Sequence, residues 1–567
     1  MTKYTAITFA PVQGFIEKSR KLRDLYGASL ILSYLSQQIV LEAKQSRELE
    51  VISPGSIDLQ KGMPNRILIK GIFSEDDARK VLLTAWKDIL GVCQNWIRRN
   101  LKDFEPYFWE REWENWGNHT WEIFWGTGTG STEAEGIIAA MENLETRKLS
   151  RAWTGLNWIG ESSSLTGTDG IAFPGLGGKQ RNPKNLTYRS EKTKIEEFYT
   201  RLAEITEETG EDTPEGKFIA LNEKLSIPEL VKRLVTRHGI ADEISKKRKH
   251  NPPFEKLPQS FKEIQRKPTK ETCGQWTGWF IGDGDKVGKK LKEIARKQGE
   301  QGLETFTFQL RKWGEKFYNN FAQETVHGRV VYAGGDDFLG VIFSDKPDKY
   351  TIKGLEALEW LMTLRDKWNE HGRDITLSVG FVWVTGSVPL RDILQHCREA
   401  EQKAKNLKRD RVTIRIVFNS GQYVEWTCPW DYLHILKQYR DRNCNTYSQW
   451  EDSSFNPNKL PNWSHIYSDL TQLKSRHAFG LAENRSRINL DNKTIENSLN
   501  DRSVLLDFFE IYFPNWKAKL KQKEKYLIGA ADDATQAQKA QGMIHWIEDL
   551  ITIGWHLCSD ISSSLDH

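Results

Sequence analysis

The stretch RVVYAGGDDFLGVIF, residues 329–343, decides the fold. Two runs rich in β-branched and aromatic residues flank a short Gly/Asp centre, which predicts a β-hairpin. Gly334 and Gly335 at its tip can adopt positive φ and leave no side chain in the way of a ligand. Asp336 and Asp337 follow as adjacent carboxylates, which raise each other's pKa unless a cation neutralises them. Carboxylate oxygens suit Mg²⁺ or Mn²⁺, but taken alone this hairpin favours a solvated turn over a metal site.

A second acidic turn lies upstream, in WFIGDGDKVG at residues 279–288. This pattern predicts a strand that ends near Asp283 and Asp285, then a helix from about residue 289 to 321, and then the hairpin. A carboxylate at a strand end beside a carboxylate pair on a neighbouring hairpin is the arrangement of a two-metal nucleotidyl-transfer site, in which the ions lie ~4 Å apart. The two motifs together favour a metal site over the solvated turn.

These motifs resemble those of the large subunit of type III CRISPR effector complexes, the CRISPR polymerase with paired palm domains. The Gly-Gly-Asp-Asp motif of that family matches residues 334–337, and its Asp-x-Asp strand end matches residues 283–285, with Gly288 beyond. Diguanylate cyclases belong to the same broad palm group but usually carry Glu where Asp337 stands, so the hairpin favours the CRISPR branch.

The N-terminal stretch resembles a motif near the start of the same family's first palm, which lacks the acidic hairpin and helps to hold a second nucleotide. The matching residues are Gln13, Phe15, Arg20, Arg23, Asp24 and Ser29. Taken alone, this stretch predicts a short strand and an amphipathic helix with a solvated basic face. The resemblance implies instead that Arg20, Arg23 and Ser29 contact a nucleotide.

The resemblance implies an RNA-activated synthase of cyclic oligoadenylates. Asp283, Asp336 and Asp337 are expected to be catalytic and to hold two Mg²⁺ or Mn²⁺, with Asp285 as a further metal ligand or a nucleotide contact. The 3′-hydroxyl of one ATP then attacks the α-phosphate of another. The expected nucleotide-binding residues of the catalytic palm are Gly284, Gly334, Gly335, Ser378 and Lys405. The alternative for Lys405 is a solvated helix lysine.

The expected partners are the other subunits of a type III complex: the subunit that binds the 5′ end of the guide, the small subunit and the backbone subunits. Guide RNA and target RNA are also expected partners. Two further hypotheses remain open at this stage. The chain is a scaffold with a silent palm, or it is a stand-alone GGDEF-like cyclase that uses GTP without RNA or partners.

The expected fold class is α+β, with two ferredoxin-like palms, helical insertions and a helical C-terminal domain. The expected domains are a first palm with an inserted Trp-rich segment (1–150), a helical and loop domain (151–267), the catalytic palm (268–425) and a helical domain (426–567). Residues 161–170 resemble a knuckle that carries zinc-binding Cys in many relatives. Ser and Thr stand at the Cys positions here, so we expect no structural zinc.

Composition sets further limits. A chain of 567 residues is expected to fold as several domains, and its net charge of +4 confines any RNA-binding surface to a local patch. The six Cys are far apart, no leader is evident and no apolar run reaches the ~20 residues of a membrane span, which together predict a cytoplasmic protein. None of the 12 His is followed by Asp, so HD-type nuclease activity is not expected.

Overall fold

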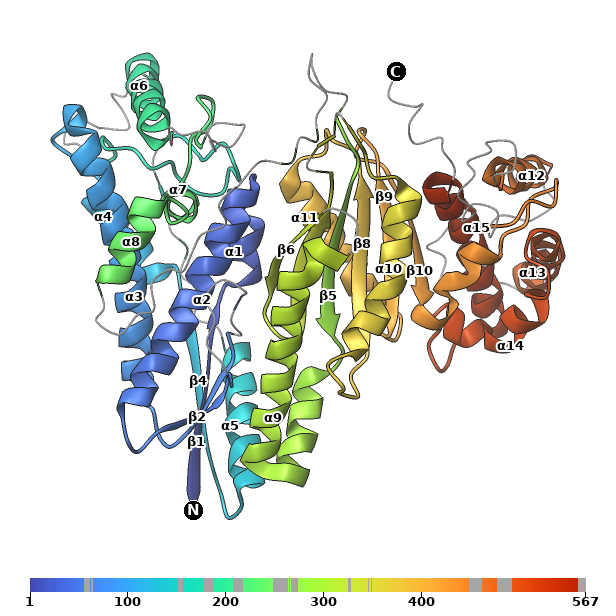
Figure 1. The fold of residues 1–567 in the computed structure, drawn as a ribbon, viewed down its shortest axis with the longest axis horizontal. Coiled ribbons are helices and arrows are strands. Elements are labelled where there is room, and N and C mark those ends of the chain that lie inside the picture. Colours follow the sequence, from blue (N-terminus) through green and yellow to red (C-terminus); the bar gives the residue numbers. More distant parts are fainter. Residues whose placement is uncertain are drawn as a thin grey trace.

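The computed structural model describes most of the chain (Figure 1). The described residues are 1–55, 62, 65–150, 155, 157–158, 160–177, 188–207, 218–247, 264, 266, 274–324, 328–344, 346–347, 349–447, 461–476 and 492–558. Two sheets lie side by side, each covered by helices, and a group of helices follows at the C-terminal side. The expected boundary at residues 267–268 lies outside the described residues.

The first sheet has the strand order β2-β3-β1-β4. Its elements are β1 (Thr2–Ala10), α1 (Gln13–Glu17), α2 (Leu22–Gln45), β2 (Glu50–Ser53), β3 (Ile67–Lys70), α3 (Glu75–Asn100), η1 (Lys102–Phe104), α4 (Glu110–His119), β4 (Glu122–Gly130) and α5 (Glu133–Leu149). Central β1 pairs antiparallel with β3 and with β4. This is the ferredoxin-like arrangement. The Trp-rich segment belongs to it, because it supplies edge strand β4, which the sequence reading missed.

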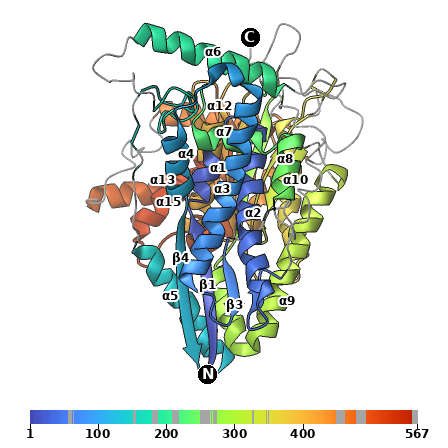
Figure 2. The same cartoon turned by 90° about the vertical axis from the view of Figure 1, so that its left-hand side faces the viewer.

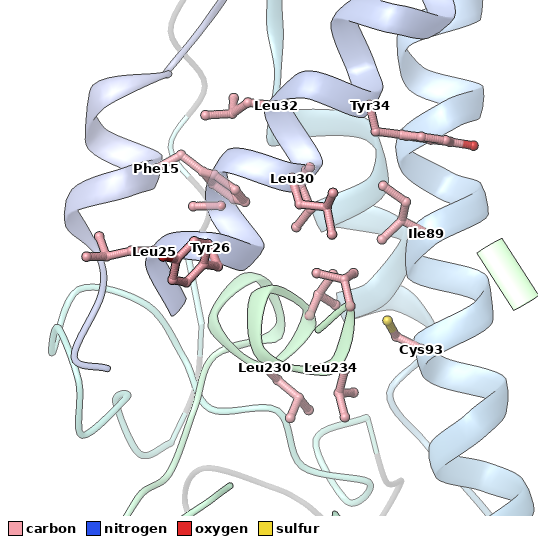
Figure 3. Packing of buried hydrophobic residues seen from close by; sticks show 14 of the residues in the cluster. Phe15, Leu25, Tyr26, Leu30, Leu32, Tyr34, Ile89, Cys93, Leu230 and Leu234 are labelled. Atoms are coloured by element: carbon pink, nitrogen blue, oxygen red, sulfur yellow. The ribbon is translucent and has the colours of Figure 1, made fainter. Parts of the chain in front are cut away.

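Helix α2 forms the centre of the first palm's core. Ile31, Leu35 and Ile39, which share one helical face, are fully buried. Figure 2 shows α2 and α3 side by side, and α7 (Ile227–Leu234) lies against α2 at its N-terminal end. Figure 3 shows part of the buried apolar cluster formed by these helices, to which α2 contributes Leu30, α3 contributes Ile89 and Cys93, and α7 contributes Leu230 and Leu234.

The second sheet has the strand order β10-β9-β8-β5-β7-β6. Its elements are β5 (Thr277–Gly284), α9 (Val287–Glu324), β6 (Gly328–Ala333), β7 (Asp337–Ile342), α10 (Gly354–Asn369), β8 (Leu377–Val384), α11 (Leu390–Asn406), β9 (Arg411–Val417) and β10 (Tyr423–Pro429). The four strands β8-β5-β7-β6 repeat the ferredoxin-like order, and β9 adds a parallel neighbour to β8. The predicted hairpin is confirmed: β6 and β7 pair antiparallel, with Ala333 opposite Phe338 across the tip.

The remaining helices form two groups. Between the palms in sequence lie α6 (Tyr188–Thr206), α7 and α8 (His238–Lys246); after them come η2 (Trp430–Gln438), α12 (Trp463–Ser475), α13 (Asn492–Tyr512), α14 (Lys517–Leu527) and α15 (Gln536–Cys558). Helix α15 packs on β10 and α13. The predicted α+β class with two ferredoxin-like palms and a helical C-terminal region is therefore confirmed. Among the described residues, no helix has both the length and the apolar character needed to cross a membrane.

Candidate active site

A cavity of about 500 Å³ lies between the two palms. The first palm contributes residues of α1 and α2, the connection between β2 and β3, and part of α5. The catalytic palm contributes the end of β5, the start of α9 and the tip of the β6–β7 hairpin. The cavity therefore has one wall from each palm, and the acidic motifs lie on the wall of the second.

Three predicted carboxylates meet at this cavity. Asp283 at the end of β5 stands opposite Asp337 at the start of β7, and Asp336 precedes Asp337 in the hairpin tip. The backbone fixes this arrangement: the N–H of Gly284 donates to the carbonyl of Asp336 at 2.7 Å, and the N–H of Gly334 donates to the carbonyl of Asp337 at 2.9 Å. The prediction that these two motifs come together is thus confirmed by the strand pairing.

Glycine is required at the two positions of the hairpin tip for different physical reasons. A Cβ on Gly334 would lie 2.6 Å from Oδ1 of Asp337, so a side chain there would displace the carboxylate. Gly335 has space around it but adopts φ +143°, a conformation that other residues rarely take. Both requirements serve the position of the Asp pair.

The carboxylates of the cavity repel one another. Removal from bulk water, and next the charge of Asp283, raise the pKa of Asp336 to about 6. Removal from bulk water, and next the charge of Asp336, raise the pKa of Asp337 to about 7, although Asp337 is exposed where it lines the cavity. Burial also raises the pKa of Asp283, against the opposing charge of Lys405. A group of acids with raised pKa values at a cavity is a candidate functional site.

Lys405 of α11 is engaged by these acids. Its Nζ lies 2.8 Å from Oδ2 of Asp283 and 2.5 Å from Oε1 of Glu401. Burial opposes the charged form of Lys405, but the two carboxylates outweigh it and raise its pKa. The alternative that Lys405 is a solvated helix lysine is therefore wrong.

Asp285 and Ser378 lie together behind the cavity wall. Oδ1 of Asp285 accepts a hydrogen bond from the Ser378 hydroxyl at 2.7 Å, and Oδ2 accepts from the Thr376 hydroxyl at 2.8 Å and from the N–H of Asp410 at 3.0 Å. Both Asp285 and Ser378 are buried, and neither lines the cavity. Strand β5 ends at Gly284, so the alternation that would place Asp283 and Asp285 on one face stops before Asp285.

The three first-palm residues that were expected to contact a nucleotide do not lie together in the structure. Ser29 lines the cavity. Arg23 is buried elsewhere, with Nη1 3.1 Å from the Thr236 hydroxyl and its guanidinium over the Phe218 ring. Arg20 is half-exposed and lies 3.9 Å from a carboxylate oxygen of Glu223. The structure therefore does not bring Arg20 and Arg23 to the cavity between the palms.

A buried ion pair explains why the basic residues at the start of α2 lie away from the cavity. Asp24 accepts two hydrogen bonds from Arg233 of α7, at 2.8 and 3.0 Å, and Arg233 also donates to Glu223 at 2.6 Å. The side chains of Asp24 and Arg233 are 2% and 0% exposed, so these charges are satisfied inside the protein. The start of α2 is thus turned toward α7 by charge pairing that the sequence did not reveal.

Several cavity residues escaped the sequence reading. Arg66 immediately before β3, Lys286 at the start of α9, Tyr332 of β6 and Arg311 of α9 all line the cavity. Lys286 follows the acidic turn directly and precedes a helix N-terminus, a position that favours phosphate binding, and this signal was available in the sequence. Arg66 and Arg311 lie in no recognisable motif, so only the fold identifies them.

The donor set fits a divalent cation. Within the part of the chain that the structure describes, no three His, Cys, Asp or Glu side chains are already gathered as a metal-binding group. Asp283, Asp336 and Asp337 nevertheless offer hard oxygen donors at one cavity, and burial together with the charge of neighbouring carboxylates raises the pKa of Asp336 and Asp337. Mg²⁺ keeps several waters and needs only one or two carboxylates, so these residues are suited to hold it.

Two protein families match the chain. Residues 277–413 match the Cas10/Cmr2 second palm domain, and residues 4–87 match the N-terminal domain of the CRISPR-associated protein Cmr2. The resemblance to the large subunit of type III CRISPR effector complexes is therefore confirmed. No match was found among curated proteins.

Two matches among solved structures are a Csm1–Csm4 cassette and Csm1 itself. A Csm1–Csm4 cassette in complex with cA4 shares 14% identity, with 98% of this chain and 70% of that chain covered and a TM-score of 0.44. Csm1 of T. onnurineus shares 15% identity, with 97% and 69% covered and a TM-score of 0.42.

Proposed function

Because the acidic sheet matches the second palm domain of the Cas10/Cmr2 family and the N-terminal region matches Cmr2, we propose that the chain is the nucleotidyltransferase subunit of a guide-RNA-directed type III CRISPR complex. It joins ATP into cyclic oligoadenylates when target RNA is bound. The observation that carries this proposal is the cavity between the palms, where Asp283, Asp336 and Asp337 form one wall.

The carboxylates prepare the site for phosphate chemistry. When bound, Mg²⁺ or Mn²⁺ neutralises phosphate charge and lowers the pKa of the attacking hydroxyl. Asp283, Asp336 and Asp337 are the residues that would hold these ions. Their mutual repulsion would favour binding of a metal ion together with the nucleotidyl-donor ATP, the molecule whose α-phosphate is attacked.

Basic residues supply the rest of the nucleotide site. Lys286 and the first N–H groups of α9 face the triphosphate, because they line the same cavity next to Asp283. If Asp283 held a cation, Lys405 would be released from that carboxylate and would be available to bind the departing pyrophosphate. On the opposite wall, Ser29 and Arg66 hold the ATP that brings the 3′-hydroxyl.

The proposed partners are the other subunits of the complex, the guide RNA and the target RNA. The test uses the assembled complex with labelled ATP, Mg²⁺ and a complementary target RNA, with a no-target control. The matched variant is Asp374→Asn on the same palm, because Asp374 is 97% exposed and pairs only at the surface with Lys290. Target-dependent oligoadenylates from wild type and D374N, but not from D336N/D337N, are the expected result.

Two other results would replace the proposal. ATP binding without any product would make the chain a scaffold that binds RNA and partner subunits and retains a silent palm. Product formed by the isolated chain from GTP, without RNA or partners, would make it a stand-alone GGDEF-like cyclase. A measurement of ATP binding, together with separation of the products made from labelled ATP and from labelled GTP, distinguishes the three functions.

A further inference from the structure

Arg311 joins the two palms at the tip of the acidic hairpin. Arg311 projects from α9 and is 5% exposed. Its Nη1 donates to the carbonyl of Gly334 in the hairpin tip, at 3.2 Å, and also to the carbonyl of Gly62 in the connection between β2 and β3 of the first palm. The same nitrogen therefore holds backbone from both palms beside the carboxylate pair.

The backbone of Gly62 lies directly on the hairpin. A Cβ on Gly62 would lie 3.3 Å from Cβ of Tyr332 and 3.5 Å from Cα of Gly334. Gly62 also adopts φ +86°, which other residues take only with strain. The contact is thus built from backbone at both sides, and it leaves little room for the hairpin tip to move.

We propose that Arg311 and Gly62 position the catalytic hairpin, so that the placement of Asp336 and Asp337 depends on contact with the first palm. This inference rests on the proposed function and adds positioning residues to it. The Gly334 carbonyl held by Arg311 belongs to the residue whose N–H donates to the carbonyl of Asp337. Loss of the arginine therefore loosens the loop that sets the carboxylates.

An arginine suits this position better than a lysine. A guanidinium presents several N–H donors in a fixed plane, whereas an ammonium is a compact group on a flexible stem. Nη1 of Arg311 donates to two carbonyls, one from each palm. Both hydrogen bonds require the planar guanidinium to stay in one orientation. Arg311→Lys keeps the charge and is expected to restore only part of what Arg311→Met removes.

The test combines Mn²⁺ binding to the full-length chain, followed by electron paramagnetic resonance, with kinetics of the assembled complex. The variants are R311M, R311K and G62A. Lys312→Met is the matched control, because Lys312 is the next cation on the same helix and is exposed. For R311M we expect kcat to fall about 100-fold through misplacement of the reacting groups, with KM for ATP nearly unchanged. Mn²⁺ affinity is expected to fall about 10-fold, as for other residues that orient metal ligands.

The results separate positioning from folding and from failure of the proposed function. R311M with wild-type kcat and wild-type Mn²⁺ affinity overturns the inference. If the thermal midpoint shows that R311M is unfolded, G62A decides, because its added methyl group disturbs the same contact from the other palm. G62A with unchanged Mn²⁺ affinity then overturns the inference. If the wild-type complex makes no product, the proposed function fails, and the Mn²⁺ titration still decides the role of Arg311.

Discussion

The two palms share a strand order but differ at the strand ends that face the cavity. Strand β1 ends at Ala10 and is followed by Pro11 and Val12, whereas β5 ends at Asp283 and Gly284. The connection between β2 and β3 spans residues 54–66, while the corresponding hairpin in the catalytic palm turns within residues 334–336. The two palms therefore share a strand topology at the cavity, but only the second palm carries acidic side chains at these strand ends.

The palms also differ in how they treat buried charge. In the first palm Asp24 is paired with Arg233, and this pairing holds the pKa of Asp24 below its ordinary value although burial alone would raise it. In the catalytic palm burial and neighbouring carboxylates raise the pKa of Asp336 and Asp337. Paired acids stabilise a fold, and uncompensated acids are poised to bind a cation.

The largest expected effect follows from removal of the uncompensated charge. Asp336→Asn with Asp337→Asn should reduce oligoadenylate synthesis by at least about 10³-fold, because the electrostatic stabilisation of the phosphates is lost. The same variant should raise the thermal midpoint of the metal-free chain, because it removes repulsion that the raised pKa values reveal. Product analysis and a thermal shift assay measure the two effects.

D374N is the control, and it should change neither quantity. A lower thermal midpoint for the double variant would contradict the comparison, since it would mean that the acid pair stabilises the catalytic palm as Asp24 stabilises the first. Product at the wild-type rate would place the chemistry elsewhere.

Asp24→Asn should have the next largest effect, on stability. It leaves buried Arg233 with one acidic partner fewer, and breaking a buried pair typically costs about 3–5 kcal/mol. Hydrogen exchange should quicken in α2 and α7 and stay unchanged in β5 and β7. Asp169→Asn is the control, because its pair with Lys18 is partly exposed and should contribute less than about 1 kcal/mol.

The Asp24 pair also predicts a pH dependence. The folded pKa of Asp24 is lowered, so its contribution to stability is present above the ordinary Asp pKa of about 3.9 and is lost as pH falls through the folded pKa. Lower protection factors in α2 and α7, after correction for the intrinsic pH dependence of amide exchange, are therefore expected in acid for wild type. D24N should lack this acid-dependent step, and the same step in D24N would assign it to another group.

Asp285→Asn should have a smaller effect on activity than Asp283→Asn. Asp285 accepts hydrogen bonds from the hydroxyls of Thr376 and Ser378 and from the N–H of Asp410. It therefore orients the end of β5 against β8 and β9. We expect a loss of about 10- to 100-fold in turnover with Mn²⁺ affinity retained. Asp283→Asn should lose both. Equal loss of Mn²⁺ binding in the two variants would make Asp285 a metal ligand, as the sequence motif suggested.

The sequence predicted the catalytic palm because its signals are local. The β-branched and aromatic runs that flank residues 334–337 and the apolar run of β8 each indicate a strand, and the Gly/Asp centre marks the turn of the hairpin. The convergence of Asp283 with Asp336 and Asp337 also followed, since a strand end and a hairpin tip meet in this topology. These inferences needed no knowledge of distant contacts.

The rest of the site depends on pairings between residues far apart in the chain. The N-terminal motif implied that Arg23 contacts a nucleotide, but Arg23 lies beside Thr236, and the neighbouring Asp24 is paired with Arg233; both partners stand more than 200 residues later in the chain. Arg311 meets Gly62 across the palms, and no local pattern marks either residue. Sequence reasoning therefore brought Asp283, Asp336 and Asp337 to one cavity, but it did not separate Asp285 from them and could not tell which basic residues are left for a ligand.

The smallest expected effect is that of a chelator on the loop at residues 161–170. At residues 161–170, the hydroxyls of Ser163 and Thr166 donate to the carboxylate of Glu229 at 2.5 and 2.9 Å, and the N–H of Ser226 donates to the same carboxylate at 2.8 Å. Glu229 is 1% exposed, so this buried carboxylate cross-links the loop to α7 without thiol ligands.

Chelation should therefore separate the two regions. EDTA should leave hydrogen exchange of residues 160–177 unchanged, while it abolishes synthesis by the catalytic palm, because only the latter is expected to depend on a metal ion. Glu229→Gln should instead quicken exchange in that loop, by an amount that corresponds to about 1–3 kcal/mol for a buried hydrogen-bond network left incomplete. Faster exchange of the loop in EDTA, with zinc released in proportion to protein, would show that a metal rather than Glu229 holds it. The hydroxyl and carboxylate contacts predict the opposite, since hydroxyls are poor zinc ligands and their donors are already satisfied by Glu229.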